Sequence, residues 1–307
     1  MRALVTGARG FVGTHLVAHL KECGDDVIEM DRIIGSPSIE DALAIKTHVV
    51  AAQPSVVYHL AAQSDVAASW DDPLNTFQVN AVGTLNIMQA CVQAQVECLV
   101  SVTSSDIYGI VQPEDLPLTE QAPLRPVNPY AASKSAAEMV CVQGFLGHGL
   151  KVVRARAFNH LGPGQSEHFL AAALAAQIAR NEIRGQSKVS VGDLTARRDF
   201  TDVRDVVRAY RLLALHGKPG EAYNVCSGQD VTASELANKL LKMAKTPMSV
   251  QQNEHLLRPV EVPVLRGDNS KLLATTGWKP AIALPETLAD VLSDARHRVS
   301  DQTHSSL

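Results

Sequence analysis

A short apolar strand that runs into three spaced glycines constrains the fold of this chain more than any other feature. Arg2–Thr6 is followed by Gly7, Gly10 and Gly13, and apolar residues from Leu16 to Leu20 then recur at helical spacing. A dinucleotide-binding unit requires three glycines: one at a tight turn, one beneath the pyrophosphate, and one where the helix packs closely on the strand. We therefore expect an α/β protein with a Rossmann-type doubly wound parallel sheet and a smaller C-terminal α/β substrate-binding domain.

The second expected strand ends in an acidic residue that bears on cofactor choice. Val27–Met30 leads into Asp31, whose carboxylate could accept a hydrogen bond from an adenosine ribose 2′-OH. Arg32, together with Arg9, could instead accept a 2′-phosphate. We expect NAD(H) to be favoured and NADP(H) to be possible. A glycine turn followed by a surface aspartate would explain the same residues without any cofactor.

Strands and helices alternate through the first half of the chain, and the alternation stops near residue 160. Later strands are expected at Val56–Leu60, Cys98–Val102, Val152–Ala155, Val189–Val191 and Ala222–Val225. Helices are expected at Ile39–Ala52, from Pro73 onward, and at Pro129–Phe145, His168–Arg180, Val203–Leu215, Thr232–Ala244 and Pro285–Val299. Prolines predict an extended segment at Leu257–Pro263. We expect a dinucleotide-binding domain at 1–160 plus about 199–226, a substrate domain at 161–198 plus about 227–299, and a disordered tail at 300–307.

A tyrosine and a lysine near the start of the expected helix at Pro129 could form a catalytic pair. Tyr130 and Lys134 share one helix face, so an ammonium there could lower the pKa of the phenol. Taken alone, the spacing also fits a surface helix with a lysine lying along it. The polar cluster Thr103–Asp106 favours catalysis, because it ends a strand where an α/β sheet places its chemistry.

Charge, cysteine content and the start of the chain limit the partners that we expect. A net charge of −4 gives no general attraction to nucleic acid or to anionic membranes, and no apolar run reaches the roughly 18 residues of a membrane span. Five scattered cysteines indicate reduced thiols that pack in the interior. The strand at the very start leaves no room for a signal peptide. We expect a cytoplasmic protein that binds no metal, nucleic acid or membrane.

Five motifs in sequence order resemble the extended short-chain dehydrogenase/reductase family that acts on nucleotide-diphosphate sugars. They are Gly7-x-x-Gly10-x-x-Gly13, His59-Leu60-Ala61-Ala62, Asn80-x-x-Gly83-Thr84, Ser104 ahead of Tyr108-Gly109, and Tyr130-x-x-x-Lys134. Four further segments look most like the reductases of this family that act on GDP-6-deoxy-4-keto-D-mannose: Phe158–Ser166, Arg198–Asp205, Tyr223–Gly228 and Arg258–Val262. The resemblance covers nearly the whole chain.

The resemblance implies NAD(P)H-dependent reduction of the C4 keto group of GDP-4-keto-6-deoxy-D-mannose, giving GDP-D-rhamnose. It implies that Ser104, Tyr130, Lys134 and Asp106 are the catalytic residues. It assigns cofactor contacts to Gly7, Arg9, Gly10, Phe11, Val12, Gly13, Asp31, Arg32, Leu60, Ala61, Ala62, Asn80, Tyr130, Lys134 and Phe158. It assigns substrate contacts to Ser105, Asp106, Asn159, Arg198, Arg258 and Glu261. A homodimer formed through the helices near Leu85 and Tyr130 is also implied.

Two departures from the family pattern bear on these expectations. The dehydratases of the family carry Thr-x-Glu, with the Glu as base at C5, where this chain has Ser104-Ser105-Asp106. The shorter Asp106 favours simple reduction, because its carboxylate would fall short of the C5 proton. Ser38 stands where the family usually places an Asp that contacts the adenine amino group. The alternatives are a GDP-mannose 4,6-dehydratase, another nucleotide-sugar epimerase or dehydratase, or a non-catalytic cofactor-sensing protein.

Overall fold

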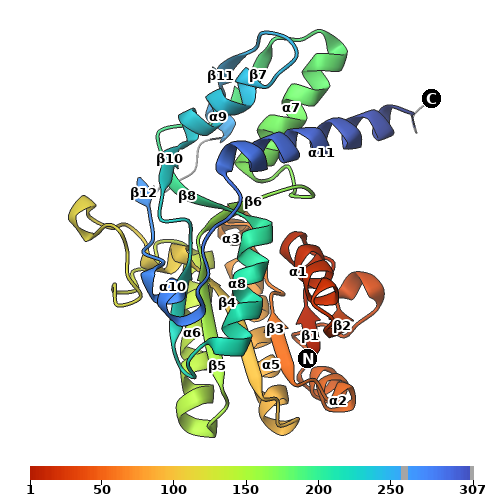
Figure 1. Ribbon diagram of the computed structural model, residues 1–307, viewed down its shortest axis with the longest axis vertical. Helices are drawn as coiled ribbons and strands as arrows, with labels where there is room; N and C mark the ends of the chain where they lie inside the picture. The colour runs from red at the N-terminus through yellow and green to blue at the C-terminus, as the bar shows by residue number, and fades with distance from the viewer. Residues whose placement is uncertain (257–261, 305–307) are drawn as a thin grey trace.

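A parallel sheet of six strands forms the centre of the computed structural model, which describes residues 1–256 and 262–304 (Figure 1). Its strands, in spatial order, are β2 (Asp26–Met30), β1 (Arg2–Thr6), β3 (Val56–His59), β4 (Cys98–Ser104), β5 (Val152–Ala157) and β9 (Ala222–Val225). Every neighbouring pair is parallel. The order reverses direction beside β1, and such a switch point opens a crevice at the carboxyl ends of the strands. The expected Rossmann-type fold is confirmed.

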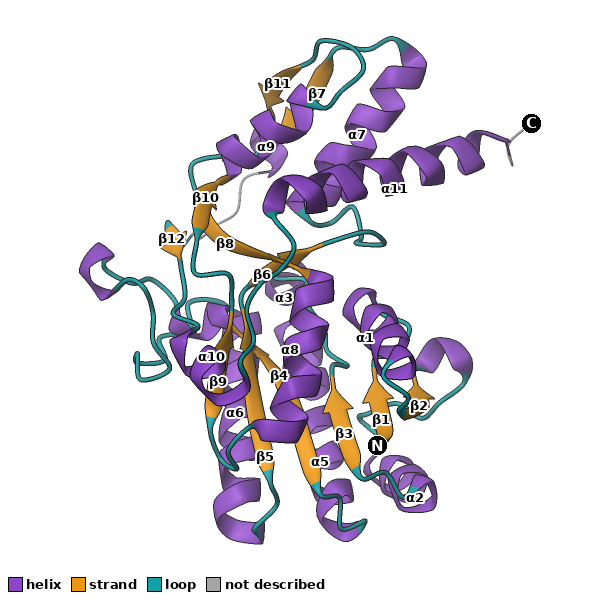
Figure 2. Ribbon diagram, in the orientation of Figure 1, coloured by secondary structure: helices purple, strands orange, loops and turns teal. Residues whose placement is uncertain are grey.

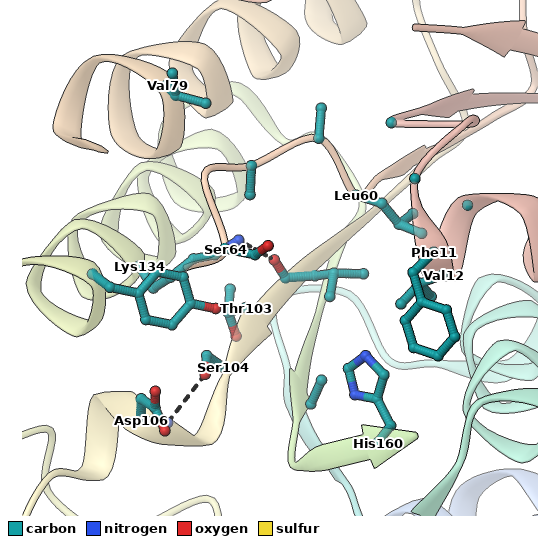
Figure 3. Close-up of a pocket in the computed structure, with 18 of the residues that line it drawn as sticks. Phe11, Val12, Leu60, Ser64, Val79, Thr103, Ser104, Asp106, Lys134 and His160 are labelled. Carbon is teal, nitrogen blue, oxygen red and sulfur yellow. Dashed lines mark hydrogen bonds between the residues drawn. The ribbon is translucent and has the colours of Figure 1, made fainter. Parts of the chain in front are cut away.

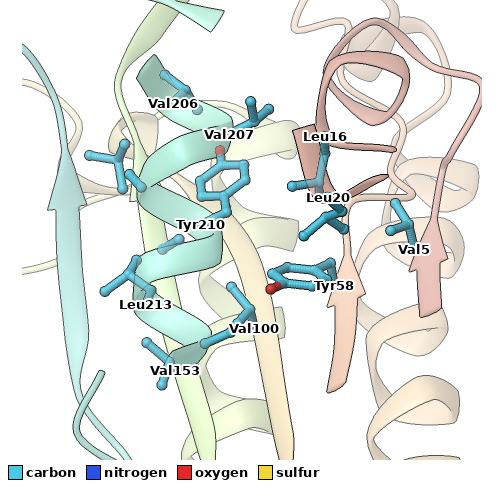
Figure 4. Packing of buried hydrophobic residues seen from close by; sticks show 14 of the residues in the cluster. Val5, Leu16, Leu20, Tyr58, Val100, Val153, Val206, Val207, Tyr210 and Leu213 are labelled. Carbon is cyan, nitrogen blue, oxygen red and sulfur yellow. The ribbon is translucent and has the colours of Figure 1, made fainter. Parts of the chain in front are cut away.

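Helices cover both faces of this sheet, which explains why its central strands are apolar on both sides. One face packs against α1 (Phe11–Glu22) and α8 (Val203–His216), and Figure 4 shows Leu16, Leu20 and Tyr210 of these helices meeting side chains of the strands. The other face packs against α2 (Ala42–Ala52), α5 (Gly83–Gln93) and α6 (Pro129–His148). Strands β3, β4 and β9 are thereby almost wholly buried, while the edge strand β2 stays partly exposed.

Local capping sets where several helices begin. The Asn128 side chain accepts a hydrogen bond from Ala131 N at 2.7 Å, and Pro129 opens α6 as expected. Asp41 caps α2 in the same way, so that helix begins at Ala42 rather than at the expected Ile39. The segment from Pro73 starts with α4 (Pro73–Phe77) and continues through a π-helical turn, Gln78–Val82, into α5. The remaining short helices are α3 (Ala68–Asp71), α10 (Ser270–Thr276) and 3₁₀ turns at Arg32–Ile34, Ser105–Tyr108, Pro113–Asp115 and Glu254–Leu256.

A second lobe lies above the carboxyl ends of the sheet strands (Figure 2). Its core is formed by α7 (Leu170–Arg184), α9 (Ala233–Lys242) and α11 (Leu284–His304), with the paired strands β7 (Lys188–Val191) and β11 (Ser249–Gln252). A small sheet of β6 (Asn159–Leu161), β8 (Arg197–Asp202), β10 (Asp230–Thr232) and β12 (Val264–Leu265) lies between the two lobes. A capping box opens α9, since Thr232 and Glu235 bond each other's backbone N–H.

The C-terminal tail and one cysteine differ from expectation. The predicted disordered tail from Ser300 is wrong as far as His304, because α11 continues to that residue and nothing between Glu286 and His304 breaks a helix. Cys23 is exposed rather than packed inside, whereas the other four cysteines are buried. The predicted extended segment at Leu257–Pro263 lies mostly outside the described residues. No helix in the described ranges is both long and apolar enough to span a membrane.

Candidate active site

A cleft of about 450 Å³ opens at the carboxyl ends of β1, β3 and β4, and it collects most of the site residues expected from the sequence. Its lining includes Gly7, Gly10, Phe11, Val12, Gly13, Asp31, Arg32, Leu60, Ala61, Ala62, Ser104, Ser105, Asp106, Tyr130, Lys134, Phe158, Asn159 and Arg198. Figure 3 shows how side chains from the glycine turn, from β4 and from α6 face one another across this cleft. Segments far apart in the sequence thus share one site.

Among the described residues, two expected site residues, Arg9 and Asn80, do not lie in the lining. Arg258 and Glu261 are outside the described residues. The Arg9 side chain points to Glu29, with Nη2 at 2.9 Å from a carboxylate oxygen. Asn80 is buried, and its amide bonds Gln63 and the Ser133 hydroxyl. These bonds use the polar atoms of Asn80 inside the protein and give it a supporting position, and its direct contact with the cofactor stays a prediction.

The turn between β1 and α1 has the close packing that a dinucleotide cradle needs. Gly7 has a φ of +69°, which side chains rarely tolerate. A Cβ placed on Gly13 would lie 2.0 Å from the Gly7 carbonyl oxygen, so only glycine allows α1 to start this close to the strand. Gly10, the N-cap of α1, has no side chain that could accept a hydrogen bond. The first N–H groups of the helix therefore face the cleft without a side-chain partner. A pyrophosphate would fit this helix N-terminus.

The walls of the cleft hold further polar atoms that suit a bound dinucleotide. Asp31 accepts hydrogen bonds from Arg9 N and Ile33 N, both at 3.0 Å, and a carboxylate has lone pairs left for a ribose hydroxyl. Arg32 is exposed beside it at the cleft edge. The buried Tyr210 hydroxyl and Gln165 Oε1 line the cleft and have no hydrogen-bond partner within the described part of the chain. The residues present therefore fit a nicotinamide dinucleotide.

Ser104, Tyr130 and Lys134 meet where β4 packs against α6. Lys134 is buried, and its Nζ donates a hydrogen bond to the Val102 carbonyl oxygen at 3.1 Å. Ser104 Oγ accepts a hydrogen bond from Asp106 N at 3.2 Å (Figure 3), and the Ser104 hydroxyl also interacts with Tyr130. Tyr130 is only 9% exposed. A carbonyl oxygen between Ser104 and Tyr130 could receive hydrogen bonds from both hydroxyls.

Burial shifts the pKa values of both members of the helix pair. Desolvation raises the pKa of Tyr130, the Asp106 carboxylate raises it further, and the Ser104 hydrogen bond opposes the rise. The predicted lowering of the Tyr130 pKa by Lys134 is therefore wrong here, because the loss of water around the phenol outweighs the effect of nearby donors. Burial also lowers the pKa of Lys134 to about 8. At neutral pH the phenol keeps its proton and the amine is largely charged.

Several lining residues were missed by the sequence reasoning. His160 stacks on Phe11, with ring centroids 6.1 Å apart and planes 9° apart, and its Nδ1 donates to the Phe158 carbonyl oxygen. Burial lowers the pKa of His160, so the ring is neutral. The sequence signal that could have identified His160 is its position next to Asn159 in the motif segment Phe158–Ser166. Glu40 also lines the cleft and accepts a hydrogen bond from Ser38 Oγ at 3.0 Å, where the family pattern lacks its usual Asp.

Known proteins resemble this chain along nearly its full length. A sequence model of the family described as GDP-mannose 4,6 dehydratase matches residues 4–291. The GDP-6-deoxy-D-mannose reductase of Pseudomonas aeruginosa is 39% identical over 315 residues, covering 98% of this chain and 99% of that protein. The structure of RMD from Pseudomonas aeruginosa complexed with NADPH has a TM-score of 0.87 at 36% identity, covering 97% and 100% of the two chains. The Thermus thermophilus UDP-glucose 4-epimerase in complex with NAD has a TM-score of 0.86 at 31% identity, covering 96% and 99%.

Proposed function

Because the chain belongs to the GDP-mannose 4,6-dehydratase family of NAD(P)-dependent enzymes that act on nucleotide sugars, we propose that it reduces GDP-4-keto-6-deoxy-D-mannose at C4 to GDP-D-rhamnose. The observation that carries this proposal is the near full-length similarity, at 39% identity, to a GDP-6-deoxy-D-mannose reductase. Ser104, Tyr130 and Lys134, gathered at one end of the cleft, provide the groups that a ketone reduction needs.

The cofactor would occupy the glycine turn and the wall that leads from it to α6. Gly10 and the start of α1 would hold the pyrophosphate, Asp31 or Arg32 the adenosine ribose, and Lys134 the nicotinamide ribose. When bound, a reduced nicotinamide dinucleotide supplies the hydride that C4 receives. Asp31 favours the unphosphorylated ribose of NADH, and Arg32 leaves NADPH acceptable, which is the cofactor complexed with the similar RMD protein.

Tyr130 would protonate the oxygen at C4 as the keto group becomes an alcohol. Its raised pKa keeps the proton on the phenol before the step. Ser104 would donate a second hydrogen bond to the same oxygen, and negative charge developing there would be stabilised by both groups. Lys134, one turn further along α6, would place a positive charge beneath the phenol once the proton has been given up.

Asp106 separates the proposed reductase from a dehydratase. A dehydratase must remove a proton from C5, whereas reduction of a ketone needs no base there. Asp106 is one methylene shorter than the Glu that serves the dehydratases. Its backbone N–H instead contacts Ser104 Oγ at 3.2 Å, so the residue would orient the serine. GDP-mannose 4,6-dehydration is the second candidate, because the matching family model is named for that activity.

The second lobe would bind the nucleotide sugar. Asn159 and Arg198 line the cleft on the side of this lobe, and Ser105 lies next to Ser104. We propose that they contact the sugar nucleotide, together with Arg258 and Glu261. We also propose the domain division expected from the sequence, with 1–160 and about 199–226 binding the dinucleotide and 161–198 and about 227–299 binding the substrate.

A homodimer in the cytoplasm completes the proposal. Leu74, Phe77 and Met139 are exposed apolar side chains on α4 and α6, two helices that contact each other. A second copy of the chain could cover them, and light scattering of the purified protein would measure the dimer. Five cysteines that are all free suit a reducing compartment.

The test is to incubate the purified protein with GDP-mannose and, separately, with its 4-keto-6-deoxy derivative, each with NADH or NADPH, and to identify the products. We expect the keto sugar to be reduced at C4 while GDP-mannose is unchanged. Dehydration of GDP-mannose without reduction of the keto sugar would contradict the proposal and favour the second candidate.

A further inference from the structure

A buried ion pair lies behind the candidate site, between α6 and β5. Arg156 Nε and Nη2 donate to the two carboxylate oxygens of Glu138, both at 2.8 Å. Arg154 Nη1 donates to the same carboxylate at 3.1 Å. Glu138 is fully buried and Arg156 is 5% exposed. A bidentate pair of this kind fixes the two side chains in distance and in orientation.

Glu138 is linked to both segments that carry the proposed proton donors. It lies two helical turns after Tyr130 and one after Lys134 on α6, so the three side chains share one face of that helix. Thr103, the residue before Ser104 on β4, donates its hydroxyl to Glu138 Oε1 at 2.9 Å. The Glu138 carboxylate on α6, the helix of Tyr130, thus contacts β4, the strand that ends in Ser104.

Arg156 is linked to the turn that carries Asp106. Its Nη1 donates to the Tyr108 hydroxyl at 3.0 Å, and Tyr108 ends the 3₁₀ turn Ser105–Tyr108. The guanidinium also lies 5.2 Å from the centre of the Tyr108 ring. Tyr108 in turn donates its hydroxyl to Asn224 Oδ1 on β9 at 2.7 Å. The network therefore joins α6, β4, β5, β9 and the Asp106 turn.

We propose that Glu138 and Arg156 are positioning residues, whose ion pair sets the register of α6 against β4 and β5 and thereby the placement of Tyr130 beside Ser104. Apart from Glu138 and from Lys134, which bonds the Val102 carbonyl oxygen, α6 buries mostly small side chains such as Ala131 and Ala137, and small side chains interlock less than a bidentate ion pair. A displacement of about 1 Å at reacting groups can cost on the order of 100-fold in rate. The inference rests on the proposed function, because it assigns these residues a part in that reaction.

The ion pair persists over the pH range in which an enzyme would work. Burial by itself would raise the pKa of Glu138, but the Arg156 hydrogen bonds and the charges of both arginines outweigh it, and the pKa lies below its usual value. Burial works against the Arg156 charge, but Glu138 more than compensates and raises the Arg156 pKa. The network is thus a constant feature of the fold and not a pH switch.

The experiment compares three variants of the full chain with wild type. Glu138→Gln keeps the size of the side chain and removes its charge, and Thr103→Val replaces with a methyl group the hydroxyl that bonds Glu138 and, at 3.4 Å, the Ala155 carbonyl oxygen. Asp25→Asn is the matched control. Asp25 is another buried, arginine-paired carboxylate, bonded to Arg211 Nε at 2.7 Å, and it lies at the amino end of β2, away from the cleft. Thermal unfolding, cofactor binding by fluorescence titration and steady-state kinetics are measured for each.

If the ion pair positions Tyr130, Glu138→Gln lowers kcat by about tenfold or more while the KM for the keto sugar and the cofactor affinity change less than about threefold. Thr103→Val gives a smaller loss of the same kind. Asp25→Asn lowers the melting temperature and leaves kcat within about twofold. A folded Glu138→Gln with wild-type kcat would overturn the proposal, as would losses of kcat that follow melting temperature in all three variants. If Glu138→Gln does not fold, Thr103→Val decides the question: a lowered kcat with a nearly unchanged KM supports the proposal, and a wild-type kcat overturns it.

A crystal structure of Glu138→Gln separates this inference from the proposed function. Should wild type fail to reduce the keto sugar, the proposed function is wrong, but the distance from Tyr130 Oη to Ser104 Oγ still reports on positioning. A change in that distance relative to wild type supports the inference. An unchanged distance with an unchanged α6 overturns it.

Discussion

The Lys134 ammonium donates a hydrogen bond to the Val102 carbonyl oxygen at 3.1 Å, which ties the helix of Tyr130 to the strand that ends in Ser104. Lys134 is buried in the wall of the cleft, and burial lowers its pKa to about 8. A lysine in this position is charged at neutral pH but close to losing its proton. The behaviour of the site near pH 8 should therefore depend on this side chain.

The first prediction concerns this titration. Lys134 is protonated below its pKa and neutral above it, so kcat/KM for the cofactor should fall as the pH rises through about 8, because that parameter reports groups of the enzyme before the cofactor binds. Rates measured from pH 6 to 10 test this. Lys134→Arg, which stays charged throughout, should lose the fall even if its activity is lower. A wild-type profile that is flat to pH 10 would contradict the prediction.

The second prediction separates reductase from dehydratase chemistry. Tyr130→Phe keeps the ring and removes the proton, so kcat for the keto sugar should fall about 10²–10⁴-fold while cofactor binding largely survives. Asp106→Asn should matter much less, because reduction needs no base at C5. Both variants are assayed with the keto sugar and excess cofactor. Dehydration of GDP-mannose by wild type, abolished in Asp106→Asn, would defeat the reductase proposal.

The third prediction concerns cofactor choice at Asp31 and Arg32. We expect wild type to use both dinucleotides with a modest preference for NADH, since Asp31 repels a 2′-phosphate and Arg32 partly compensates. Asp31→Ala should weaken NADH binding about tenfold or more, the loss of a hydrogen bond to a charged group being about 1.5–3 kcal/mol. Arg32→Ala should weaken NADPH selectively. Kinetic constants with each cofactor measure this, and a strong wild-type preference for NADPH would mean that the arginines dominate.

The fourth prediction tests the packing of the glycine turn. Gly13→Ala would place a Cβ 2.0 Å from the Gly7 carbonyl oxygen, so the start of α1 must shift. We expect a loss of about 1–3 kcal/mol of stability and a marked loss of cofactor affinity. Gly147→Ala in α6 is the control, because its Cβ would meet only the flexible Gln143 side chain. It should gain about 0.5–1 kcal/mol from helix propensity. If Gly13→Ala and Gly147→Ala changed cofactor affinity equally, the proposed role of the Gly7–Gly13 turn in cofactor binding would be wrong.

Local spacing was enough to predict the elements of the site. The strand–glycine–helix unit at Gly7–Gly13, the start of α6 at Pro129 and the common face of Tyr130 and Lys134 follow from neighbours along the chain, whose geometry the backbone sets within one or two turns. The alternation of strands and helices likewise predicted a parallel sheet, because consecutive βα units can return only by crossing over its face. The similarity in motifs then supplied the chemistry.

Tertiary packing alone decided what surrounds those elements. The Tyr130 pKa moves opposite to the predicted direction because burial depends on segments far away in sequence, which spacing does not reveal. The same holds for Asn80, whose amide bonds Gln63 and Ser133 inside the protein, and for the pairing of Glu138 with Arg156. Such partners are set by how whole helices pack on the sheet, so the sequence by itself determined the reactive groups and only the folded chain determined their environment.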